Sequence, residues 1–161
     1  MLFTIPKEKK YVDNEVFEKF RQLTHIKVEQ GNQAYTSVDG VLFSKYMTEL
    51  HAYPACRDAD SYEIHEGVRK IWHKTFAGAH NLKNIKIPGS VSFIGATAFE
   101  SCSGITEINM PAVLMNDNHR MLYGCCNLER ISIEKGRGSL KSVGRFIENR
   151  TIFGHIFFLR Y

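Results

Sequence analysis

The sequence predicts a repeat solenoid, a fold in which successive turns of one domain stack on each other. An apolar pattern returns every 23 residues, in the segments 82–87 (LKNIKI), 105–110 (ITEINM) and 128–133 (LERISI). One unit cannot fold alone, because burying about six apolar side chains at roughly 1.5–3 kcal/mol each does not offset ordering about 23 residues at roughly 1–2 kcal/mol each. Stacked units share their buried faces, so an array of them can fold.

Each unit contains one predicted strand, because apolar residues two positions apart point to the same face of a strand. This pattern gives six candidate strands, or rungs, of the stack. They are centred on the pairs Phe3/Ile5, Ile26/Val28, Tyr62/Ile64, Ile85/Ile87, Ile108/Met110 and Ile131/Ile133. We therefore expect repeats over about 3–28 and 59–133, with short turns near Phe76, Phe99 and Leu122 that return the chain to the strand side.

The interval between the second and third rungs is longer than one period. From Val28 to Ile64 it measures 36 residues instead of 23. It contains Asp39-Gly40 between two apolar-rich runs, which is a strong signal for a two-residue hairpin. A second turn near residues 45–49 would add a third strand. The sequence thus predicts a β-meander inserted at about 33–55.

From residue 87 to residue 102 the sequence reads IPGSVSFIGATAFESC, which resembles the repeat of BspA-like leucine-rich repeat proteins of bacterial surfaces. The resemblance covers roughly 5–133, and the inserted segment is similar to insertions in that family. It implies an α/β fold, a right-handed leucine-rich repeat solenoid with parallel strands, short helical turns and the inserted β-meander. It also implies a surface-exposed or secreted protein that contributes to adhesion or host contact.

Composition is typical of one globular domain, since 43% of the 161 residues are apolar and 24% are charged. No run of about 18 or more apolar residues occurs, so no membrane span is expected. The net charge is +4, and the basic residues that follow Glu134 are more typical of a solvated face than of a nucleic-acid site. We therefore expect no nucleic-acid partner.

The first ten residues, MLFTIPKEKK, place charges after a very short apolar start. This is the wrong order for a signal peptide, which begins with positive charge and continues with an apolar region. We therefore expect either a cytoplasmic protein or a leader that lies outside this chain. The family resemblance favours the cell surface or secretion, and both locations stay open.

The sequence has no recognisable catalytic or metal-binding motif. Cys102 and Cys125 lie one period apart, which predicts buried packing residues, and the resemblance implies free thiols. His119, Cys125 and Cys126 fit no standard zinc spacing. No nucleophile elbow, P-loop or H-E-x-x-H segment is present. We therefore predict a protein that is not an enzyme and that needs neither a cofactor nor a metal.

The residues between the buried positions of each rung point outward and form the candidate binding surface. They line up at the repeat period, so a rigid array would hold many weak polar contacts in place for a protein or peptide ligand. The candidate partner-binding residues are His25, Lys27, Asn84, Lys86, Glu107, Asn109, Arg130 and Ser132. Six rungs at about 4.8 Å would make a strip roughly 24 Å long. The alternative for any one of these residues is an ordinary solvated side chain.

The function that these observations favour is a non-enzymatic protein-binding or adhesion module, whose ligand would be a host surface or matrix protein. The alternative is an intracellular scaffold, or a fragment of a larger repeat array with no separate activity. Residues 1–161 are expected to form one domain, in which 134–161 act as a C-terminal cap or tail. Because uncovered strand edges invite pairing, self-association through the chain ends is a further expectation.

Overall fold

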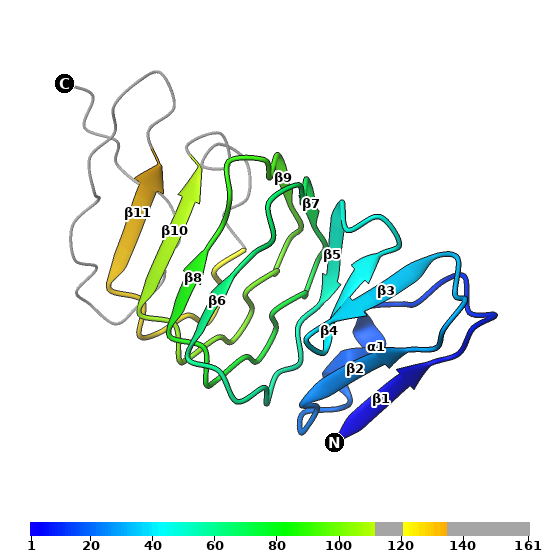
Figure 1. Cartoon of the computed structure of the whole chain (residues 1–161). Coiled ribbons are helices and arrows are strands. Elements are labelled where there is room, and N and C mark those ends of the chain that lie inside the picture. Colours follow the sequence, from blue (N-terminus) through cyan, green and yellow to red (C-terminus); the bar gives the residue numbers. More distant parts are fainter. Residues whose placement is uncertain (112–120, 135–161) are drawn as a thin grey trace.

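The computed structural model describes residues 1–111 and 121–134, and Figure 1 shows how its strands are arranged. The elements in chain order are β1 (Leu2–Ile5), α1 (Glu15–Glu18), β2 (His25–Val28), β3 (Tyr35–Val38), β4 (Val41–Ser44), β5 (Glu49–Ala52), β6 (Ser61–Glu63), β7 (Lys70–Ile71), β8 (Asn84–Lys86), β9 (Phe93–Ile94), β10 (Glu107–Pro111) and β11 (Arg130–Glu134). The cap or tail predicted at 134–161 lies outside the described residues, apart from Glu134 at the end of β11.

One side of the molecule is a parallel sheet whose neighbouring strands are one repeat apart. Its order is β6-β8-β10-β11 (Figure 1). The register places Ser61 opposite Asn84, Asn84 opposite Glu107, and Glu107 opposite Arg130, so that each pair is separated by 23 residues. The predicted period therefore sets the hydrogen-bonding register, and the expectation of stacked parallel strands is confirmed for these four rungs.

The opposite side of the turns is a second sheet, of order β3-β4-β5-β7-β9. In it β7 and β9 are parallel, with Lys70 opposite Phe93 and Ile71 opposite Ile94. β5 also pairs in parallel with β7, so the meander formed by β3, β4 and β5 extends this sheet. The chain alternates between the two sheets, which makes the fold a β-solenoid.

The structure corrects the expectation of short helical turns, because it has little helix. α1 spans four residues and is the only α-helix among residues 1–111 and 121–134. In the turns that lead the chain back to the strand side, backbone N–H groups donate to the neighbouring turn. The amide of Phe76 donates to the carbonyl of Ala98, and the amide of Gly78 donates to that of Glu100, both at 2.8 Å. A helix would need those donors within its own segment.

The main apolar core lies between the two sheets and repeats with the strands. Ile85, Ile108 and Ile131 are buried at equivalent positions of β8, β10 and β11. On the return side, the rings of Phe76 and Phe99 stack with centroids 5.0 Å apart and planes inclined by 14°. Each turn therefore covers the apolar side chains of the turn before it, as the solenoid argument requires.

The two period-related cysteines are buried and free, as the sequence predicts. The Cys102 thiol donates to the carbonyl of Phe76 at 2.9 Å, and the Cys125 thiol donates to the carbonyl of Phe99 at 3.1 Å. The neighbouring Cys125 thiol and burial raise the pKa of the Cys102 thiol well above its ordinary value. Cys102 therefore acts as a small apolar residue with one hydrogen-bond donor, and it is unsuited to nucleophilic chemistry.

The hairpin expected at Asp39-Gly40 joins β3 to β4. Val38 pairs with Val41, so Asp39 and Gly40 alone form the loop between the strands. Their φ angles are 50° and 79°, the left-handed values that a two-residue turn of type I′ requires. Glycine is needed at the second position because a Cβ there would lie 2.8 Å from a ring carbon of His25.

The meander lies between two separate apolar cores. Val41 and Phe43 of β4 belong to the main core of the solenoid. Leu42 between them belongs to a smaller core, together with Ile5 of β1 and Ile26 of β2. A strand with apolar side chains on both faces needs cover on both sides. The meander therefore packs against both cores and separates them.

The six predicted rungs consequently do not form one stack, and that expectation is wrong. β1 and β2 pair in parallel in a two-stranded sheet of their own, with Phe3 opposite Ile26. β2 meets the hairpin instead of a further rung, since the amide of Ile26 donates to the carbonyl of Gly40 at 2.9 Å. The uninterrupted strip has four strands and spans about 14 Å, against the roughly 24 Å expected from six.

Close approach between turns predicts a specific sensitivity to added side-chain volume. A Cβ at Gly104 would lie 1.9 Å from the carbonyl oxygen of His80, whereas a Cβ at Gly89 would meet nothing within 4 Å. We expect Gly104→Ala to lower the free energy of unfolding by about 1–3 kcal/mol. Gly89→Ala, the matched control, should change it by less than about 0.5 kcal/mol. Urea denaturation measures both, and equal midpoints for the two variants would contradict the packing described.

Candidate functional site

The outward side chains of the four-stranded sheet form one polar surface, here termed the strand face. Residues at the same register of successive strands line up in two rows across it. The first row is Ser61, Asn84, Glu107 and Arg130, and the second is Glu63, Lys86, Asn109 and Ser132. The parallel register brings together six of the eight predicted residues, namely Asn84, Lys86, Glu107, Asn109, Arg130 and Ser132.

The strand face also contains two residues that the sequence reasoning missed. Ser61 and Glu63 of β6 are exposed and pair in register with Asn84 and Lys86. The signal was available, because the Tyr62/Ile64 rung had been recognised and the residues on either side of Tyr62 occupy the same repeat positions as Asn84 and Lys86.

The other two predicted residues, His25 and Lys27, do not lie on the strand face. Both are exposed on β2, which belongs to the separate two-stranded sheet. The His25 ring also lies against the hairpin at Gly40. They flank the buried Ile26 as Asn84 and Lys86 flank Ile85, but the meander separates their sheet from the other rungs.

The charges on the strand face are paired between neighbouring strands. The Lys86 ammonium lies 2.6 Å from the Glu63 carboxylate, and an Arg130 guanidinium nitrogen lies 3.3 Å from the carboxylate of Glu107. The Ser132 hydroxyl is 3.2 Å from the second oxygen of Glu107. Both ion pairs are largely solvated, so each contributes little to stability. Their effect is to order the side chains along the rows.

The part of the chain that the structure describes contains no cluster of metal-binding side chains. Within residues 1–111 and 121–134, no group of three or more His, Cys, Asp or Glu side chains is placed to hold a metal ion. In the same part of the chain, no helix has the length and apolar character needed to cross a membrane.

Two hollows lie away from the strand face. One, of about 350 Å³, separates the end of α1 from the return turns and is bordered by the ion pair of Glu18 with Lys74 at 2.6 Å. The other, of about 450 Å³, lies beside β1 and is lined mainly by apolar side chains, among them Phe3, Ile5 and Val12. Neither contains a residue of the strand face.

Comparison with known proteins agrees with this geometry. A family model described as the BspA type leucine rich repeat region, in 6 copies, matches residues 47–149. The chain belongs to the BspA-type leucine-rich repeat family. No curated protein matches it. The BspA-type match covers the strand face from β6 to β11, and it begins within the meander.

Three solved structures resemble this BspA-type chain. The pneumococcal vaccine antigen PcpA is 26% identical with a TM-score of 0.66, and the match covers 82% of this chain and 38% of PcpA. A leucine-rich repeat protein from Eubacterium ventriosum is 23% identical with a TM-score of 0.65, covering 82% and 42%. A leucine rich cell surface protein from Faecalibacterium prausnitzii is 19% identical with a TM-score of 0.58, covering 84% and 48%. The chain thus spans less than half the length of each.

Because the strand face is solvated, its residues should be separable from folding. We expect Asn84→Ala and Lys86→Ala each to change the free energy of unfolding by less than about 0.5 kcal/mol. Ile85→Ala, at the buried position between them, should cost about 2–5 kcal/mol. Thermal and urea unfolding measure the difference. A loss at Lys86 as large as that at Ile85 would mean that the face is structural.

Proposed function

We propose that this BspA-type chain is a non-enzymatic protein-binding or adhesion module and that its strand face contacts the partner. The observation that supports this most directly is the registered double row of polar side chains on a buried apolar base. Asn84, Glu107 and Arg130 stand on strands whose alternate residues are locked in the core. A ligand would therefore not bear the cost of ordering the backbone beneath them.

The charge pattern indicates the kind of partner. Each row contains one carboxylate and one cation, and these are already paired with each other, as Glu63–Lys86 and Glu107–Arg130. A surface with both signs interspersed suits a protein or peptide with mixed charge and hydrogen-bonding groups. A polyanion such as nucleic acid would call for a field of one sign.

The proposed location is the cell surface, with a host surface or matrix protein as the partner. Its support is that one structural relative is described as a cell surface protein and another as a vaccine antigen. The alternative is an intracellular scaffold, or a segment of a larger repeat array with no separate activity. What favours a larger array is that each of the three relatives is more than twice as long as the part that this chain matches.

The strand-face proposal is tested with a triple variant that keeps the net charge unchanged, Asn84→Ala/Lys86→Ala/Glu107→Ala. We expect it to lose at least tenfold in affinity for the protein that the wild-type domain captures on an array of extracellular-matrix and host-surface proteins, since about 1.4 kcal/mol of lost contacts is enough. Biolayer interferometry measures the affinity.

The matched control is Gln30→Ala/Lys45→Ala/Glu66→Ala, which removes the same chemical groups from exposed positions outside the face. It should bind as the wild type does. Equal binding by the wild type and the face variant would contradict the proposed site. Capture of no array protein by the folded domain would favour the scaffold or larger-array alternative.

A further inference from the structure

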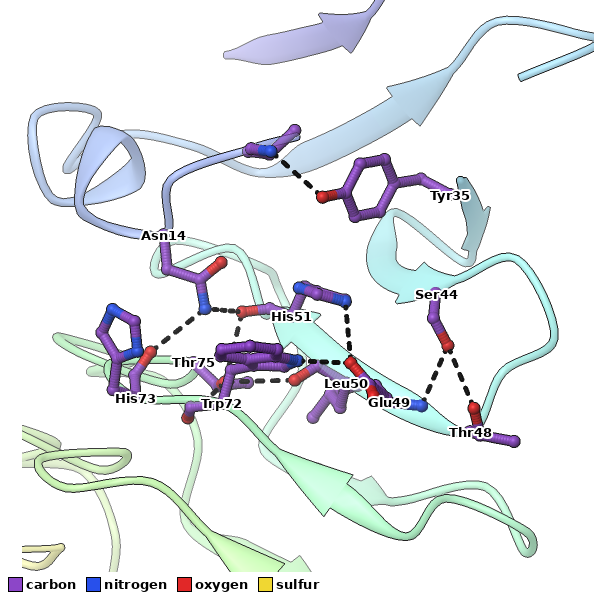
Figure 2. Close-up of polar contacts among 11 residues, drawn as sticks. Asn14, Tyr35, Ser44, Thr48, Glu49, Leu50, His51, Trp72, His73 and Thr75 are labelled. Carbon is purple, nitrogen blue, oxygen red and sulfur yellow. Dashed lines mark hydrogen bonds and ion pairs between the residues drawn. The ribbon is translucent and has the colours of Figure 1, made fainter. Parts of the chain in front are cut away.

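The seam between the two apolar cores contains a buried side-chain amide that joins the parts. Asn14, next to α1, is buried and donates to the carbonyl of His51 at 2.8 Å and to that of His73 at 3.1 Å (Figure 2). Nearby, the amide of Val12 donates to the Tyr35 hydroxyl at 3.0 Å. These contacts, together with the hydrogen bond from the amide of Cys56 to the carbonyl of Leu23 at 2.8 Å and the ion pair of Lys74 with Glu18, attach residues 1–31, here termed the N-terminal unit, to the meander and the solenoid.

His51 lies at the centre of this seam, and its side chain is enclosed by aromatic rings. The residue is 8% exposed. The Tyr35 ring meets it edge-on at 5.1 Å, and the Trp72 ring stacks on it at 5.3 Å with planes inclined by 21° (Figure 2). Its Nε2 atom is 3.6 Å from a carboxylate oxygen of Glu49, and that same oxygen accepts the Trp72 indole N–H at 2.8 Å.

The Trp72 ring already carries one cation. The Lys70 ammonium lies 3.4 Å from the ring centroid, well within cation–π range. The titratable groups that face His51 from the neighbouring strands are therefore Tyr35 of β3, Glu49 of its own strand β5, and Lys70 of β7. From the N-terminal unit, the uncharged amide of Asn14 contacts the backbone carbonyl of His51. Protonation of His51 would place a second positive charge against the same indole, in a buried site with one shared carboxylate.

We propose that this seam is an acid-sensitive junction: protonation of His51 detaches the N-terminal unit from the solenoid and uncovers the apolar side of the meander. The side chains uncovered are those of the smaller core, including Tyr35, Leu42 and Ala52. The main core keeps its own packing, because Val41 and Phe43 face the other way.

The direction of the pH effect follows from the environment of the imidazole. Burial lowers the pKa of His51 from 6.5 to about 4, while Glu49 acts to raise it and Lys70 to lower it further. In the proposed open seam water reaches the ring, and its pKa moves back toward the ordinary value. The closed seam is therefore fully stable above about pH 6.5 and weakens as the pH falls toward 4, by roughly tenfold in its opening equilibrium for each pH unit.

Hydrogen exchange, corrected for the intrinsic pH dependence of amide exchange, tests the junction. Between pH 6.5 and 4.5 we expect the opening equilibrium of the N-terminal unit to rise by about fortyfold, while β8 and β10 keep their protection. The chain has a single tryptophan, so the fluorescence of Trp72 reports the same event directly. Binding of a dye for apolar surface should rise in parallel.

The variants separate the imidazole from other acid effects. His51→Phe keeps a ring between Tyr35 and Trp72 but cannot be protonated, so both readouts should lose their pH dependence. If circular dichroism at pH 7.5 shows that His51→Phe disturbs folding, His51→Gln is used in its place, because its side chain is also unable to take up a proton. His73→Gln is the matched control, since His73 also contacts the indole but is only half-buried. It should respond to acid as the wild type does.

Lys70→Met gives an independent test of the crowded indole. Without the ammonium, His51 should protonate at a higher pH, seen as an upward shift of the Trp72 fluorescence titration. The seam should nevertheless open less with acid, because the Trp72 ring then contacts the protonated His51 as its single cation.

The proposal is overturned if the seam of His51→Phe opens with acid as that of the wild type does. Simultaneous loss of protection in β8 and β10, or an acid response abolished in His73→Gln, would overturn it equally.

Discussion

Pairing between residues 23 apart is the constraint on which the rest of this structure depends. It sets the register of the four-stranded sheet, as in Ser61 with Asn84, and that of β7 with β9 in the second sheet, as in Lys70 with Phe93. It also decides which side chains meet, since equivalent positions stack on each other, as Phe76 and Phe99 do. The strand face is a direct consequence: alternate residues point outward, so a period kept in the core aligns the polar rows as well. Backbone donors committed to the next turn leave few for helices, which explains why the fold has so little of them.

The meander shows what happens where this period is broken. Its strands bring apolar side chains to both faces, so it can be stable only with cover on each side, and the N-terminal unit supplies the second cover. Two cores result where one was expected. The buried contacts of Asn14 that join them are not repeat contacts, since Asn14 reaches His51 and His73 across 37 and 59 residues. A polar seam with a buried imidazole is thus a product of the interruption and has no counterpart at the turns that follow the period.

These features also explain what the sequence could and could not predict. Rungs such as Ile85/Ile87 were predictable because two apolar residues with a polar one between them have a single sensible strand orientation. The hairpin was predictable because Asp39-Gly40 tolerates positive φ. The packing of the meander between two cores was not predictable, because Val41, Leu42 and Phe43 are consecutive apolar residues and their pattern does not show which side chain enters which core. Ser61 and Glu63 could have been found from the period alone, whereas no periodic signal points to Asn14, His51 or Trp72.

The strand face and the seam follow from different parts of the sequence, and this allows them to act independently. Side chains such as Asn84 and Lys86 are exposed and hold little of the folding energy, so they can change to suit a partner at small cost. His51 and Asn14 are buried between two cores, where a change alters how firmly those cores adhere. The two sets share no residue, and effects at separate, independent sites add. Substitutions at His51 would then change the exposure of the meander without changing the residues of the rows that we propose bind a ligand, so the two properties can be measured separately in one protein.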